Sequence, residues 1–172
     1  MEYSDIEIQE DIERNYAQKL CDATAWFGHA RALIASARIS KERASILVSY
    51  TEKSELENVC TLLYGLALEN LFKAIWIYRR FGTPYSEDWM PGTKFPSEIK
   101  THNLVKLAEL IEPKLIEKYE FSLQQLTEAT IWSGRYPCEV KASQGSAVRS
   151  PDIHEDAEAI YAKYRKYFTL SS

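Results

Sequence analysis

The fold follows from one stretch, LENVCTLLYGLALENLFKAIWIYRR, residues 56–80. Between Val59 and Tyr78 its only charged side chains are Glu69 and Lys73, and the remainder is nearly apolar all round. Leucine, alanine, phenylalanine and tryptophan without a proline favour a helix over a strand. A helix that is apolar on every face must be enclosed by other elements. We therefore predict a central helix, roughly 37 Å long at 1.5 Å per residue, in an all-α bundle.

Four further segments have features typical of amphipathic helices, with apolar residues three or four positions apart or clear start signals. One runs from residue 15 to 39, and a short one, HNLVKLAELIE, follows the cap Thr101. The segment SLQQLTEATIWSG begins at Ser122 with a capping-box pattern. The last, DIHEDAEAIYAKYRKYF, follows Ser150–Pro151, a capping residue and then proline at the first helical position.

Start and stop signals bound these segments. Ser54 followed three residues later by Glu57 is a capping box that opens the central helix. The glycine and proline at 82–84 form a stop signal after it. Residues 83–100, with three prolines, and residues 134–151, without an apolar run, are predicted loops. The sequence thus predicts helices joined by loops and no sheet.

Length and composition fit one soluble domain over residues 1–172, with a core at about 15–168. The net charge of −4 argues against a strongly basic nucleic-acid module, although a local basic patch remains open. Glu69, Asn70 and Lys73 in the middle of the apolar stretch make membrane insertion costly. We expect a cytoplasmic protein without a membrane partner.

Several familiar catalytic signatures are absent from the sequence. It contains no glycine-rich phosphate loop, HExxH, GxSxG or CxxC, and its three histidines do not have metal-ligand spacing. Three scattered cysteines give neither a disulfide framework nor a metal knuckle, and Cys21 and Cys60 are expected to be reduced core thiols. We expect no metal and no cofactor.

The carboxylate of Glu69 is the most informative polar group, because a buried lone carboxylate needs a partner. Lys73 stands at the favourable i,i+4 spacing, but its flexible stem allows the ammonium to reach outward. Arg135 follows Gly134 at a helix end, and a guanidinium pairs a carboxylate in a bidentate manner. We predict a Glu69–Arg135 salt bridge with Tyr136 packed beside it. A structural clamp and a ligand or RNA-phosphate site both remain open.

Four pieces in order, LALENLFKAI, THNLVKLAELI, WSGRYP and EDAEAIYAKY, resemble the HEPN superfamily of bacterial helical-bundle proteins. The chain is most similar to the branch with an RYP tripeptide before the last helix. The resemblance covers residues 15–168 and implies an up-and-down bundle of four or five helices that forms homodimers. It also implies a toxin–antitoxin, phage-defence or nucleotidyltransferase-linked system, with RNA, a nucleotide or a nucleotidyltransferase as the partner.

Catalytic HEPN proteins are metal-independent ribonucleases with arginine, a polar residue, three variable residues and then histidine. This chain has that spacing once, from Arg149 to His154. By this resemblance His154 would be the general acid or base toward a ribose 2′-hydroxyl, and Arg149 would stabilise the phosphorane. However, Pro151 places Arg149 in the loop before the helix, whereas active members hold both residues in a helical setting. A solvated His154 is the simpler interpretation.

His102 follows the cap Thr101, where the family often has a histidine before leucine. It either closes the long loop onto the bundle through a hydrogen bond or has a catalytic role.

Three functions remain open. The favoured one is a non-catalytic or partner-dependent module that binds RNA, a nucleotide or a partner protein. The second is an endoribonuclease that uses Arg149 and His154, and the third is a scaffold without a ligand. We expect a homodimer, the commonest soluble assembly, with Trp26, Trp76 or Trp132 as interface anchors.

Overall fold

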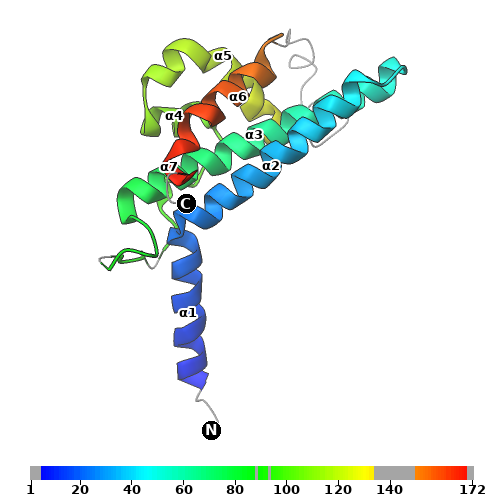
Figure 1. Ribbon diagram of the computed structural model, residues 1–172. Helices are drawn as coiled ribbons and strands as arrows, with labels where there is room; N and C mark the ends of the chain where they lie inside the picture. Colours follow the sequence, from blue (N-terminus) through cyan, green and yellow to red (C-terminus); the bar gives the residue numbers. More distant parts are fainter. Residues whose placement is uncertain (1–4, 88, 93, 134–149, 170–172) are drawn as a thin grey trace.

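The computed structural model describes residues 5–87, 89–92, 94–133 and 150–169, and every regular element in these ranges is helical (Figure 1). The elements are α1 (Asp5–Cys21), α2 (Ala23–Ser45), α3 (Tyr50–Phe81), the 3₁₀ turn η1 (Ser97–Ile99), α4 (Leu104–Ile111), α5 (Lys114–Glu128), the π turn η2 (Ala129–Ser133), α6 (Ile153–Tyr164) and α7 (Lys166–Thr169). The predicted all-α helical bundle is confirmed.

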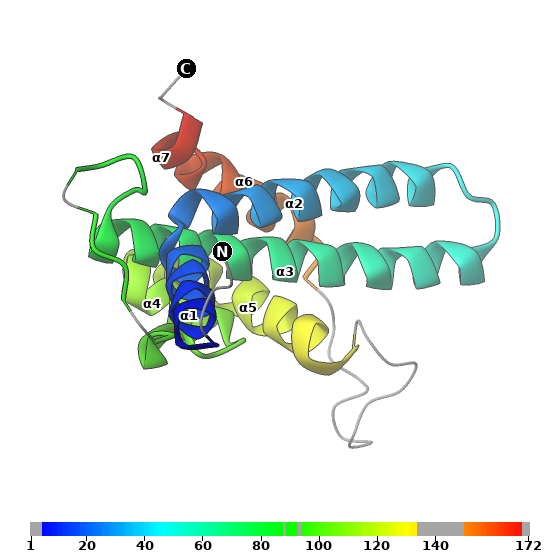
Figure 2. The ribbon, with the colours of Figure 1, turned by 90° about the horizontal axis from the view of Figure 1, so that it is seen from below.

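Helices α2 and α3 form a long antiparallel hairpin that is the spine of the molecule (Figure 2). The side of α2 that packs on α3 is made largely of alanine. Its buried residues are Ala23, Phe27, Ala30, Ile34, Ala37 and Ala44. Small side chains at this spacing let the two helices approach closely. Burial of Cys60 at this contact raises the pKa of its thiol to about 11, so the thiol stays protonated and unreactive.

The predicted enclosure of the central helix is confirmed. On its other sides α3 contacts α4, α5, η2 and α6. By length and composition α3 alone would suit a membrane span, but 72% of its most apolar window is buried inside the protein. Near the middle of α3, Ala67, Leu71 and Ile75 are buried, whereas Leu63 and Leu66 are only half-buried.

The helix predicted over residues 15–39 is wrong in one respect, because the chain breaks at Asp22. The Asp22 carboxylate accepts the backbone N–H groups of Thr24 at 2.9 Å and Ala25 at 3.2 Å, which is the N-cap arrangement. The break separates α1 from α2. As a result, α1 points away from the bundle rather than continuing along α3 (Figure 1).

Two predicted helix starts are also wrong. Ser54 lies inside α3, which begins four residues earlier with Ser49 as its cap. Ser122 lies buried in the middle of α5, and its hydroxyl donates to Asp156 on α6 instead of capping a helix. In both cases a side chain that fits a capping pattern lies in a helical backbone, where the capping geometry does not exist.

Smaller shifts occur at α4 and α6. The cap of α4 is Asn103, which accepts the N–H of Lys106 at 3.0 Å, rather than Thr101. Helix α6 begins at Ile153, three residues after Ser150. The predicted end of α3 is confirmed, because Gly82 adopts φ +77°, a conformation that favours glycine. Of the loop predicted over 134–151, only its last two residues are described.

Gly65 marks the tightest contact of α3 with the end of α5. A Cβ atom at this position would lie 2.5 Å from Cγ2 of Thr130 and 2.8 Å from the carbonyl oxygen of Leu126. Both distances are too short for any side chain. The close approach therefore requires glycine, and it sets where α5 and η2 lie against the central helix.

We predict that Gly65→Ala destabilises the protein by about 1–3 kcal/mol, because the added methyl group overpacks the contact. Gly28 in α2 is the matched control, since a Cβ there would meet nothing within 4 Å. Gly28→Ala should stabilise by about 0.5–1 kcal/mol through helix propensity. Urea denaturation of the two variants measures both effects. A Gly65→Ala protein as stable as the wild type would contradict the close approach.

Candidate functional site

Glu69 and Lys73 form a buried ion pair one turn apart on α3. The Nζ of Lys73 lies 2.7 Å from Oε1 of Glu69, and each side chain is 7% exposed. The Nζ also lies 5.7 Å from the centre of the Trp26 ring, on α2. The expectation that the Lys73 ammonium reaches outward is therefore wrong. The aromatic ring and the carboxylate together hold it inside.

His102 joins this pair from the segment before α4. Its Nδ1 lies 3.0 Å from both carboxylate oxygens of Glu69, so Nδ1–H donates to the carboxylate. The side chain is nevertheless 69% exposed. This is the hydrogen bond expected to close the long loop onto the bundle. It brings together three of the predicted residues, Glu69, Lys73 and His102.

Arg135 and Tyr136 lie outside the described residues, so the Glu69–Arg135 salt bridge stays a prediction. A carboxylate accepts up to about four hydrogen bonds. Glu69 has two partners in the described part of the chain, which leaves acceptor capacity for a guanidinium. The need for compensation of the buried charge is already met by Lys73.

We predict that Glu69→Met and Lys73→Met each cost about 3–5 kcal/mol, because each leaves a buried charge without its partner. The double variant should lose much less than the sum, since two methionines leave no buried charge. Chemical denaturation of all four proteins gives the coupling free energy. Losses that simply add would contradict the ion pair. The same cycle with Arg135→Met tests the second pairing, because only a direct contact gives a comparable coupling.

His154 lies in the first turn of α6 and is half-buried against α3. Its Nε2 lies 3.0 Å from Oγ1 of Thr61, and its ring stacks on Tyr64 with the ring centres 5.0 Å apart. The Thr61 hydroxyl already donates to the carbonyl of Glu57 at 2.8 Å. It must therefore accept from His154, which places the proton on Nε2. The simpler interpretation of a solvated His154 is wrong.

Arg149, the predicted catalytic partner of His154, lies outside the described residues. The structure therefore gives no distance between the two side chains. Their pairing in a ribonuclease site stays a prediction. The structure does describe how the imidazole of His154 contacts α3: Nε2 lies beside Thr61, and the ring stacks on Tyr64.

Glu158, one turn beyond His154, ties three helices together. It accepts the Tyr64 hydroxyl at 2.9 Å and two hydrogen bonds from Arg38 on α2, at 2.8 and 2.7 Å. Burial raises the pKa of Glu158, but the hydrogen bonds from Arg38 and Tyr64 outweigh it and leave the pKa below its ordinary value. Burial, followed by the hydrogen bond to Glu158, raises the pKa of Tyr64. Lys41 pairs with Glu155 beside it.

Sequence reasoning missed the Glu158 cluster. Its members are 94 and 120 positions apart along the chain, and no local pattern links them. The polar groups around His154 are thus engaged in holding α6 against α2 and α3. In the described residues these contacts hold helices together. They also place the proton of the His154 ring on Nε2, the nitrogen beside Thr61.

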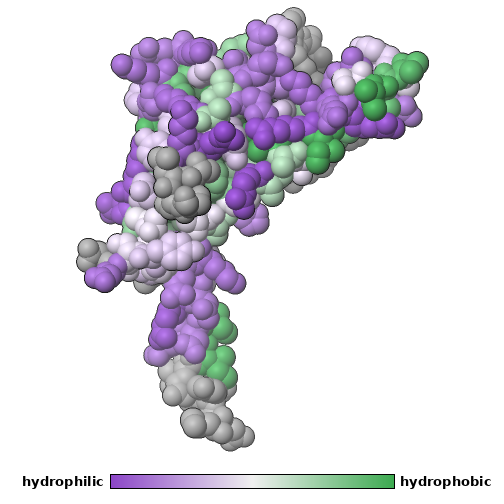
Figure 3. All heavy atoms as spheres, in the orientation of Figure 1, coloured by the Kyte–Doolittle hydropathy of each residue, from purple (hydrophilic) through white to green (hydrophobic). Residues whose placement is uncertain are grey.

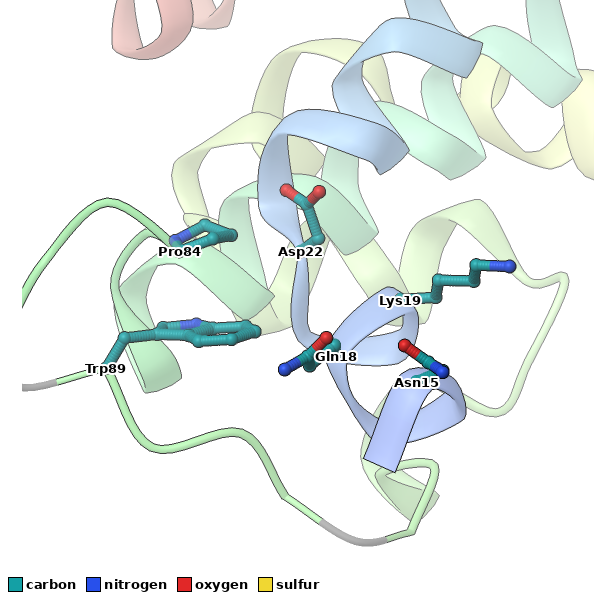
Figure 4. Close-up of a pocket in the computed structure, with 6 residues that line it drawn as sticks. All are labelled: Asn15, Gln18, Lys19, Asp22, Pro84 and Trp89. Atoms are coloured by element: carbon teal, nitrogen blue, oxygen red, sulfur yellow. The ribbon is translucent and has the colours of Figure 1, made fainter. Parts of the chain in front are cut away.

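An open pocket of about 380 Å³ lies where α1 meets α2 and the loop after α3 (Figure 4). It is lined by Asn15, Gln18, Lys19, Asp22, Pro84 and Trp89. The indole Nε1 of Trp89 is buried without a hydrogen-bond partner in the described part. The Asp22 carboxylate is engaged as the cap of α2. Across the described ranges no group of three or more histidine, cysteine, aspartate or glutamate residues is placed to hold a metal ion.

The tryptophans expected to anchor a dimer are engaged inside the protein where they are described. Trp26 donates its Nε1–H to the carbonyl of Leu20 at 3.1 Å, and its ring lies 6.0 Å from that of Phe95. Trp76 packs edge-on against Phe81 at 6.2 Å. Both are half-buried, and the side chain of Trp132 is outside the described part.

Exposed apolar side chains gather instead at two projecting parts of the molecule. On α1 they are Ile8, Ile12 and Tyr16. At the tip of the α2–α3 hairpin they are Ile46, Val48 and Tyr50, which we call the hairpin tip. Figure 3 shows hydrophobic side chains along one side of α1 and at the far end of the hairpin. These two surfaces are the strongest candidates for binding.

Comparison with known proteins does not assign the chain to a family. No family model, no curated protein and no solved structure matches the chain. The HEPN resemblance therefore stays a hypothesis that depends on four pieces of sequence. The function has to be inferred from the residues and their geometry.

Proposed function

We propose that the protein is a non-catalytic, HEPN-like module that acts by binding a partner protein through its hairpin tip. The observation that carries this proposal is the exposure of three large apolar side chains in one turn. Ile46, Val48 and Tyr50 are 66%, 101% and 85% exposed. Exposed apolar groups gathered in this way mark interaction sites in soluble proteins, and tyrosine is enriched at the centres of interfaces.

The charge distribution supports a protein partner over RNA. RNA-binding surfaces depend on basic side chains that are available for phosphates. Here Arg38, Lys41 and Lys163 are paired with glutamates of the same chain, and the net charge is −4. The hairpin tip itself is apolar, which suits a hydrophobic groove on a protein.

The surroundings of His154 restrict the part that it can play in catalysis. A general base must accept a proton from the ribose hydroxyl, and because Nε2 of His154 is engaged with Thr61, only Nδ1 can accept one. The HEPN resemblance supplies the biological setting: a cytoplasmic toxin–antitoxin or defence-type system of bacteria. Among the partners that the resemblance implies, a nucleotidyltransferase is the protein, and it is the partner that we propose for the hairpin tip.

The hairpin tip is tested with a matched pair of exposed tyrosines. Tyr50 at the tip is 85% exposed and Tyr85 in the loop after α3 is 86% exposed, so neither substitution should disturb folding. Tagged full-length protein is incubated with lysate of its source cells, and the captured proteins are identified by mass spectrometry. We expect a nucleotidyltransferase with the wild type and Tyr85→Asp, and at least tenfold less with Tyr50→Asp. Equal capture by all three, or capture of RNA alone, would refute the proposal.

The ribonuclease alternative makes a different prediction. If Arg149 and His154 cleave RNA, cleavage survives EDTA, disappears in His154→Ala and leaves 2′,3′-cyclic phosphate ends, because the nucleophile is the neighbouring hydroxyl. We expect no such cleavage of total RNA by the isolated protein. EDTA-resistant cleavage that His154→Ala abolishes, in a variant with an unchanged circular dichroism spectrum, would establish the endoribonuclease instead.

A further inference from the structure

We draw no further inference here: the strongest candidate, the surface patch of exposed apolar side chains that Ile8, Ile12 and Tyr16 form on the projecting helix α1, carries none because nothing in the structure shows what covers it.

Discussion

The buried ion pair of Glu69 and Lys73 is the constraint around which the bundle is arranged. Helix α3 is enclosed by its neighbours, so charge at its centre is tolerated only where the two groups neutralise each other at 2.7 Å. Trp26 on α2 and His102 before α4 converge on the same pair. The pair thus fixes how both segments lie against the central helix. An apolar replacement of similar volume would keep the packing but remove these directional contacts.

The fold class could be predicted because about twenty successive residues of α3 are nearly all apolar, and together they indicate a helix enclosed by other helices. The helix starts were less predictable because each depends on one or two residues. Ser54 and Ser122 fit capping patterns, yet both lie inside helices. Asp22 had no place in the sequence prediction, although it divides α1 from α2. Whether a polar residue caps a helix depends on its backbone conformation, which tertiary packing decides.

In the candidate sites, contacts between residues that are close in sequence could be predicted, and contacts between residues far apart in sequence could not. The need of Glu69 for a partner follows from the apolar run around it, and Lys73 is near in sequence. Glu158 is different, because its partners Tyr64 and Arg38 come from other helices. The break at Asp22 turns α1 and its apolar side chains away from the α2–α3 hairpin.

The two exposed apolar surfaces lie at different ends of the spine (Figure 1). Helix α3 has 32 residues and spans about 48 Å at 1.5 Å per residue, so the hairpin tip is far from the root of α1. Binding at one surface therefore leaves the other free.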